Sequence, residues 1–203
     1  MNIALIGASG NIGSKILAEA LSRGHSVTAI VRNTDALPTH DRLSARKGDV
    51  GDEAGLSALL TGHDAVISSL HFSAFDPDSL LAAIKASGVK RYIAVGGAGS
   101  LELKPGLRLV DSEEFPAEWK PEARKGVDYL ARLRREQDLD WTFISPSIMI
   151  EPGKRTGTFR LGDDTVLFAP DGSSRISQED YAIALMDELE NPAHIRQRFT
   201  VGY

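Results

Sequence analysis

The chain has 203 residues, 42% of them hydrophobic and 25% charged, and a net charge of −5, which together predict one globular domain over residues 1–203. The acidic balance and the lack of a large basic cluster argue against nucleic acid or a membrane surface as a partner. The absence of cysteine excludes disulfides and cysteine-bound metals, and the lack of a long apolar run or a secretory leader favours a cytoplasmic location.

A glycine turn directly follows the first apolar run, residues 3–6. Its glycines have the spacing G-x-x-G-x-x-G and lead into a segment whose apolar residues recur at helical spacing. Glycine lets the backbone approach a ligand closely, and the first N–H groups of a helix have no internal partner. The pattern predicts a cradle for the diphosphate of a dinucleotide; the alternative is a plain strand-to-helix connection. The residues expected to contact the cofactor here are Gly7, Ala8, Ser9, Gly10, Asn11, Ile12 and Gly13.

The second predicted strand, residues 27–31, ends without an acidic residue at its tip. Arg32 and Asn33 follow it directly, where a dinucleotide-binding fold contacts the adenosine ribose. A carboxylate there binds the 2′-hydroxyl of NAD, whereas an arginine accommodates the 2′-phosphate of NADP. The sequence thus favours NADP(H) over NAD(H); the alternatives are a solvated Arg32 and a ribose contact from Asp35 further along.

The next two units keep the order of strand and then helix. A weaker strand at residues 43–46 precedes Asp49 and Val50, which are predicted to bind and cover the adenine; a simple turn aspartate is the alternative. Asp52 then caps a short helix. A fourth strand, residues 64–69, ends in hydroxyl side chains where the chain passes the middle of the cofactor. The residues expected to contact the cofactor there are Ser68, Ser69 and Leu70.

Two further strands complete the predicted nicotinamide side of the site. A helix that starts with Asp76 and Pro77 leads to a strand at residues 92–95, which ends in a glycine-rich loop. A helix that begins at Pro121 leads to a strand at residues 141–144. The backbone after each strand is expected to pass beside the nicotinamide, where a free N–H binds the carboxamide. The residues concerned are Gly96, Gly97, Pro146, Ser147 and Ile148.

The C-terminal part has a weaker periodicity. Residues 159–161 and 165–168 flank a Gly-Asp-Asp sequence, which predicts a β-hairpin. Ser177 and Asp180 form a capping box at the start of a helix, and a last short strand covers residues 199–201.

Strands that alternate with helices predict an α/β fold: a single-domain, Rossmann-like, doubly wound parallel sheet with a small C-terminal extension on the substrate side. Ligands of such sheets bind beyond the carboxyl ends of the strands, where the strand order reverses. The loop at residues 150–157 and the segment after Gly99 are expected to wall the acceptor side of that cleft.

Candidates for acid–base chemistry are few. His71 follows the fourth strand and is the one histidine expected to reach the mouth of the pocket; simple solvation is the alternative. Ser100 and Ser147 follow the fifth and sixth strands and are further catalytic candidates. No spacing of histidines and carboxylates predicts a metal site.

These motifs together resemble the atypical, NmrA-like branch of the short-chain dehydrogenase/reductase superfamily. Its bacterial NADH-flavin reductases are similar over nearly the full length, and biliverdin-IXβ/flavin reductase is a more distant relative. The shared features are the glycine spacing, Arg32, and residues 48–50, 95–101, 141–146, 152–157 and 176–182. The resemblance implies the cofactor contacts named above and the reduction of a flavin or similar planar acceptor, with flavin as a substrate and not as a bound prosthetic group.

The chain departs from the superfamily at its acid–base pair. Typical members carry a Tyr-x-x-x-Lys motif as their acid–base pair. In this chain Leu133, and not a lysine, stands four residues after Tyr129, which disfavours alcohol–ketone chemistry and sugar epimerisation. Gly97 stands at the family's strand-end serine, for which Ser100 is a possible substitute, and Ser147 stands where biliverdin reductase has a histidine. Hydride transfer to a flavin needs little beyond stacking of donor and acceptor, so an NADPH-dependent reductase is favoured. The alternative is a non-catalytic NADP(H)-sensing regulator, and the sequence does not distinguish a monomer from a homodimer.

Overall fold

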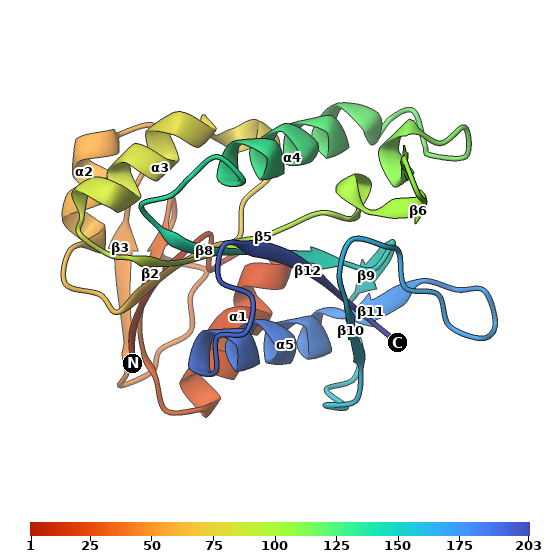
Figure 1. The fold of residues 1–203 in the computed structure, drawn as a ribbon. Helices are drawn as coiled ribbons and strands as arrows, with labels where there is room; N and C mark the ends of the chain where they lie inside the picture. Colours follow the sequence, from red (N-terminus) through yellow and green to blue (C-terminus); the bar gives the residue numbers. More distant parts are fainter.

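An eight-stranded sheet forms the centre of the computed structural model, which describes residues 1–203 (Figure 1). All neighbouring strands are parallel except at one edge, where β10 (Arg160–Gly162) is antiparallel to β12 (Gln197–Gly202). The spatial order is β10 (Arg160–Gly162), β12 (Gln197–Gly202), β8 (Asp140–Pro146), β5 (Arg91–Val95), β4 (Ala65–Ser68), β1 (Asn2–Ile6), β2 (Ser26–Val31) and β3 (Leu43–Lys47). The order reverses between β1 and β4, which opens a crevice at their carboxyl ends.

Helices cover both faces of this sheet (Figure 1). Side chains on a strand alternate between the faces, so Ile3 and Leu5 of β1 join one core, while Ala4 and Ile6 join the other. Strands that are apolar on both faces are typical of buried parallel sheets, and the predicted doubly wound, Rossmann-like fold is confirmed. The first layer holds α1 (Asn11–Ser22) and α5 (Gln178–Glu190), and the second holds α2 (Glu53–Leu60), α3 (Pro77–Ala86) and α4 (Lys120–Leu133).

Three helices begin with the side-chain caps that the sequence predicts. Asp52 and Asp76 each accept a hydrogen bond from the backbone N–H three residues on, at 3.0 and 2.9 Å. At α5 the Ser177 hydroxyl accepts one from the N–H of Asp180 (3.0 Å). The Asp180 carboxylate does not bond back to the cap but accepts from the backbone N–H and the hydroxyl of Thr156 (2.7 and 2.5 Å). The start of α5 therefore also fixes the loop before β10.

The predicted hairpin around residues 162–164 is wrong. β10 pairs with β12, and residues 165–168 do not return along β10. Instead, the N–H of Glu102 donates to the carbonyl oxygen of Asp164 (2.8 Å), and the N–H of Val166 donates to the carbonyl oxygen of Glu102 (2.9 Å). Both pairing partners are distant in sequence, so the local turn residues do not decide the pairing.

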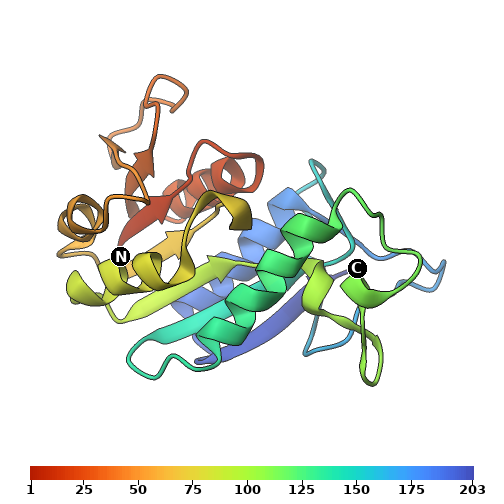
Figure 2. The same cartoon turned by 90° about the horizontal axis from the view of Figure 1, so that it is seen from above.

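Short elements lie at one end of the sheet, near the C-terminus (Figure 2). Some come from the C-terminal part, where the sequence predicts a small extension, and others from residues 102–108. β9 (Met149–Glu151) pairs in parallel with β11 (Arg175–Ser177), and β6 (Glu102–Lys104) pairs antiparallel with β7 (Leu107–Arg108). One-turn 3₁₀ helices lie at Phe72–Ala74, Ala98–Ser100 and Leu109–Asp111. No helix in the structure has the length and apolar character that a membrane crossing requires.

Candidate nucleotide and acceptor site

The glycine turn after β1 leaves the start of α1 open to a ligand. Gly7 has a φ of 82°, and a Cβ at this residue would overlap the carbonyl oxygen of Ser69, just after β4. A Cβ at Gly13 would overlap the carbonyl oxygen of Gly7, so α1 packs closely on the turn. Gly10 is the N-cap, no side chain caps the first helical turn, and that turn contains no acidic residue. Its free N–H groups and the helix dipole favour a phosphate at this position.

A cavity of about 290 Å³ lies beside the glycine turn and is called here the nucleotide pocket. The Arg32 side chain is exposed and forms no ion pair or hydrogen bond within the protein, so it is available to an anion. Asp49 accepts a hydrogen bond from the N–H of Gly51 through Oδ1 (2.9 Å), which leaves Oδ2 available to a ligand. The predicted cofactor contacts that line this pocket are Gly7, Ser9, Gly10, Arg32, Asp49, Val50, Ser69 and Leu70.

Several predicted cofactor contacts do not line this pocket. The Ser68 side chain is buried, and its hydroxyl bonds to the hydroxyl of Tyr92 (2.6 Å). Asn33 is exposed, and its side-chain oxygen accepts the backbone N–H two residues on (2.9 Å). The predicted contacts that line neither this pocket nor the neighbouring cavity are Ala8, Asn11, Gly13, Asn33 and Ser68. Their contacts with a cofactor stay predictions, whereas Ile12 lines the neighbouring cavity.

Tyr129 lies in α4 but outside both cavities. Its side chain is 1% exposed, and its hydroxyl forms a short hydrogen bond with that of Tyr92. Burial raises the pKa of Tyr92 to about 12 and raises the pKa of Tyr129 well above its ordinary value. Because Leu133 stands four residues after Tyr129, the site contains no tyrosine–lysine acid–base pair.

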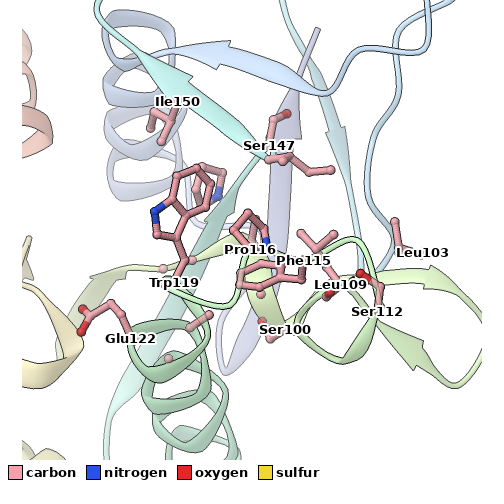
Figure 3. Close-up of a pocket in the computed structure, with 18 of the residues that line it drawn as sticks. Ser100, Leu103, Leu109, Ser112, Phe115, Pro116, Trp119, Glu122, Ser147 and Ile150 are labelled. Carbon is pink, nitrogen blue, oxygen red and sulfur yellow. Dashed lines mark hydrogen bonds between the residues drawn. The ribbon is translucent and has the colours of Figure 1, made fainter.

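A larger cavity, of about 630 Å³, adjoins the nucleotide pocket and is called here the acceptor cavity (Figure 3). The two cavities are adjacent, because residues one or two positions apart line them. Gly10 and His71 line the nucleotide pocket, and Ile12 and Phe72 line the acceptor cavity. Its volume is in the usual range for small-molecule sites. The predicted nicotinamide contacts all line it: Gly96, Gly97, Pro146, Ser147 and Ile148.

The opposite wall of the acceptor cavity is aromatic, which the sequence did not reveal. In Figure 3, Ser147 and Ile150 stand on one side, and Phe115 and Trp119 on the other. The Trp119 side chain is 53% exposed, and exposed apolar surface of this kind is typical of a binding site. The sequence does contain two aromatic residues, Phe115 and Trp119, in the irregular stretch before the helix that begins at Lys120, and these are the signal for this wall.

The expected acceptor wall at residues 150–157 is only partly correct. Ile150 lines the acceptor cavity, but residues 151–157 do not. Arg155 donates two hydrogen bonds to Glu19 of α1 (2.8 and 2.9 Å), and the N–H of Gly157 donates to Asp180 of α5 (2.9 Å). The hydrogen bond from Arg155 lowers the pKa of the buried Glu19. The segment after Gly99 lines the cavity as expected.

The three catalytic candidates have different surroundings. Ser147 lines the acceptor cavity but is 1% exposed, and its hydroxyl donates to the carbonyl oxygen of Val201 (3.0 Å). Ser100 also lines it, and its hydroxyl accepts from Nη1 of Arg198 (3.3 Å). His71 lines the nucleotide pocket, with a side chain that is 88% exposed. The titratable side chains that line the acceptor cavity are Glu114, Glu118 and Glu122.

The fold and the site together define an NAD(P)-binding protein of the Rossmann type, with a phosphate cradle, a nucleotide pocket and an adjoining cavity at the carboxyl edge of a parallel sheet. A family model described as NAD(P)H-binding matches residues 7–192, and the chain belongs to that family.

Similar proteins match this chain over nearly its whole length. The uncharacterized protein YwnB of Bacillus subtilis is 40% identical over 209 residues, which cover 99% of this chain and 98% of YwnB. A "putative epimerase" from Bacteroides thetaiotaomicron has a TM-score of 0.96 at 41% identity, covering 100% of this chain and 96% of that one. A "putative NADH-flavin reductase" from Streptococcus pneumoniae has a TM-score of 0.84 at 38% identity, covering 100% and 99%. The resemblance to NADH-flavin reductases is confirmed, while the relatives carry two different activity names.

Proposed function

We propose that the protein reduces a flavin or a similar planar small molecule by direct hydride transfer from NADPH. The observation that carries this proposal is the acceptor cavity of about 630 Å³ beside the nucleotide pocket. Phe115, Trp119 and Phe168 line it and offer aromatic surface to a planar ring. Hydride transfer requires donor and acceptor to be held in contact and shielded from water, and a cavity of this kind meets both requirements.

The lack of a tyrosine, lysine or histidine in the acceptor cavity favours this reaction over epimerisation. The acceptor cavity is lined by no tyrosine, lysine or histidine, and Tyr129 is buried against Tyr92. Oxidation of a sugar hydroxyl needs a group that takes its proton. A flavin ring takes a hydride without forming an alkoxide, so it needs no proton donor of matched pKa in the protein.

The preference for NADPH rests on Arg32. Its guanidinium is exposed at the rim of the nucleotide pocket and has no partner in the protein. A 2′-phosphate would accept charge-assisted hydrogen bonds from it. No acidic residue follows β2 directly, so no carboxylate at the tip of that strand is placed to repel this phosphate.

Turnover tests the proposal. The protein is mixed with NADPH and with riboflavin, FMN, biliverdin or a quinone, and the loss of NADPH absorbance is followed. Steady oxidation with at least one planar acceptor is the expected result. Tight binding of NADPH without oxidation by any acceptor would contradict a reductase and favour an NADP(H)-sensing regulator. The same measurements with NADH give the nucleotide preference.

A further inference from the structure

The acceptor cavity has carboxylates at its rim that nothing in the protein neutralises. Both oxygens of Glu122 are engaged, because they accept the backbone N–H groups of Phe72 (2.5 Å) and Ser73 (3.2 Å). Glu114 and Glu118 also line the cavity, are exposed, and form no hydrogen bond or ion pair within the protein. An incoming molecule therefore meets two uncompensated carboxylates.

The cavity also offers no free cation to an anionic ligand. A buried arginine, Arg198 of β12, lies directly behind Ser100 of the cavity wall. Its Nε donates to Oδ1 of Asp164 (2.7 Å), and its Nη1 donates to the hydroxyls of Ser100 (3.3 Å) and Ser145 (3.4 Å). Asp164 pairs with Arg198 and also with Arg134 (3.3 Å), and neither guanidinium lines the cavity. Lys120, at the start of α4, does not line the cavity.

Ser100 brings a free hydroxyl hydrogen to the same cavity. This side chain is 9% exposed, its oxygen accepts from Arg198, and its O–H has no acceptor in the protein. The other two serines of the lining, Ser112 and Ser147, donate to backbone carbonyl oxygens (2.8 and 3.0 Å). A buried donor without a partner is costly, so a ligand that accepts from Ser100 gains free energy on binding.

We propose that the acceptor is an uncharged or cationic planar aromatic molecule, without phosphate or carboxylate groups, that packs on Trp119 and accepts a hydrogen bond from Ser100. This rests on the proposed function, because it describes the molecule that receives the hydride. An anionic group would lose its hydration in the cavity without gaining a counter-ion, and it would lie near Glu114 and Glu118. The rim therefore selects against anions.

Riboflavin and FMN are matched probes, because they share one ring system and differ in a phosphate. Binding is measured by flavin fluorescence with the protein saturated with NADP⁺, so that no turnover is needed. Riboflavin is expected to bind about threefold to tenfold more tightly than FMN at low ionic strength. The difference should narrow as salt is added, because the rim charges are exposed and become screened.

Glutamate-to-glutamine substitutions at the cavity rim remove charge and keep side-chain shape, so they test whether charge sets the flavin preference. The double variant Glu114→Gln/Glu118→Gln should improve FMN binding about threefold relative to riboflavin binding. Glu113→Gln is the matched control, because Glu113 is exposed and adjacent to Glu114 but does not line the cavity. Ser100→Ala should weaken both flavins by a similar factor, about fivefold, and leave their ratio unchanged.

FMN binding as tight as that of riboflavin, binding of neither flavin, or an equal effect of Glu113→Gln would overturn the proposal. A preference for riboflavin that disappears in the double variant supports it. If that preference is found but NADPH is never oxidised, the charge selectivity of the cavity stands and the proposed hydride transfer fails.

Discussion

The nucleotide pocket and the acceptor cavity lie at one edge of the same sheet, but they are built differently. The nucleotide pocket is formed by residues that directly follow strands, such as Gly7 after β1 and Arg32 after β2. The acceptor cavity combines the stretch before α4 with Phe72 and Phe168, which come from distant parts of the chain. A cofactor site can thus be encoded in local sequence, whereas the acceptor site depends on tertiary assembly.

Gly7→Ala should produce the largest effect and should break the nucleotide side alone. The new Cβ would overlap the carbonyl oxygen of Ser69 in a backbone conformation that favours glycine, so the cradle must move. We expect NADPH affinity, measured by titration calorimetry, to fall at least about a hundredfold, with riboflavin affinity changed less than about twofold. Gly62→Ala is the control, because Gly62 has the same φ of 82° and no atom within 4 Å of the added Cβ. A similar loss of NADPH affinity in Gly62→Ala would show that backbone strain far from the glycine turn is sufficient to weaken NADPH binding.

Arg32→Glu should distinguish the two coenzymes at the nucleotide pocket. The change replaces a free guanidinium with a carboxylate that repels a 2′-phosphate, so NADPH should bind about thirtyfold more weakly and NADH less than about threefold. Lys47→Glu is the control, because this exposed cation ends the neighbouring β3 without lining the pocket. Equal losses for NADPH and NADH would remove the assigned role of Arg32.

Trp119→Ala should affect the acceptor side alone. Loss of the indole face should raise the KM for riboflavin about tenfold and leave the KM for NADPH unchanged. Met149→Ala serves as the control: Met149 is another exposed large apolar side chain, 41% exposed, and it does not line the cavity. A matching rise in the KM for NADPH would mean that the two regions are not separate.

Glu19→Gln should give the smallest effect, because Glu19 and its partner Arg155 line neither cavity. Arg155 holds the pKa of Glu19 below its ordinary value, so this carboxylate stabilises the fold above its unfolded-state pKa, and that stabilisation is lost as the pH falls through the folded value. Urea unfolding should show the variant less stable by about 1–2 kcal/mol at pH 7, with the difference shrinking below the ordinary pKa of 4.5 and vanishing below the lower folded-state pKa. Glu151 is exposed and belongs to the same loop as Arg155, so Glu151→Gln is the control and should not change the stability. A stability difference for Glu19→Gln that stays constant across pH would contradict the role of the Glu19 carboxylate.

The sequence predicted most of the fold because its signals are local. Apolar runs, helix caps such as Asp52, and the glycine turn each lie within a few residues of what they determine. Ser68 shows the limit of this reasoning: strand alternation turns its hydroxyl into the core towards Tyr92, while Ser69 lines the pocket. The aromatic wall was not predicted, because the stretch before α4 has no periodicity and its aromatic residues form a wall only together with segments distant in sequence.

In the proposed function, a bound nicotinamide faces the acceptor cavity and gives its hydride directly to a planar molecule there. NADPH labelled with deuterium at one or the other of its two C4 positions, oxidised by riboflavin, tests this most directly. A fixed orientation at Gly97 and Ile148 exposes one face of the ring, so one label should slow the reaction and the other should not. Equal slowing by both labels, or no slowing by either in a single turnover, would contradict the account.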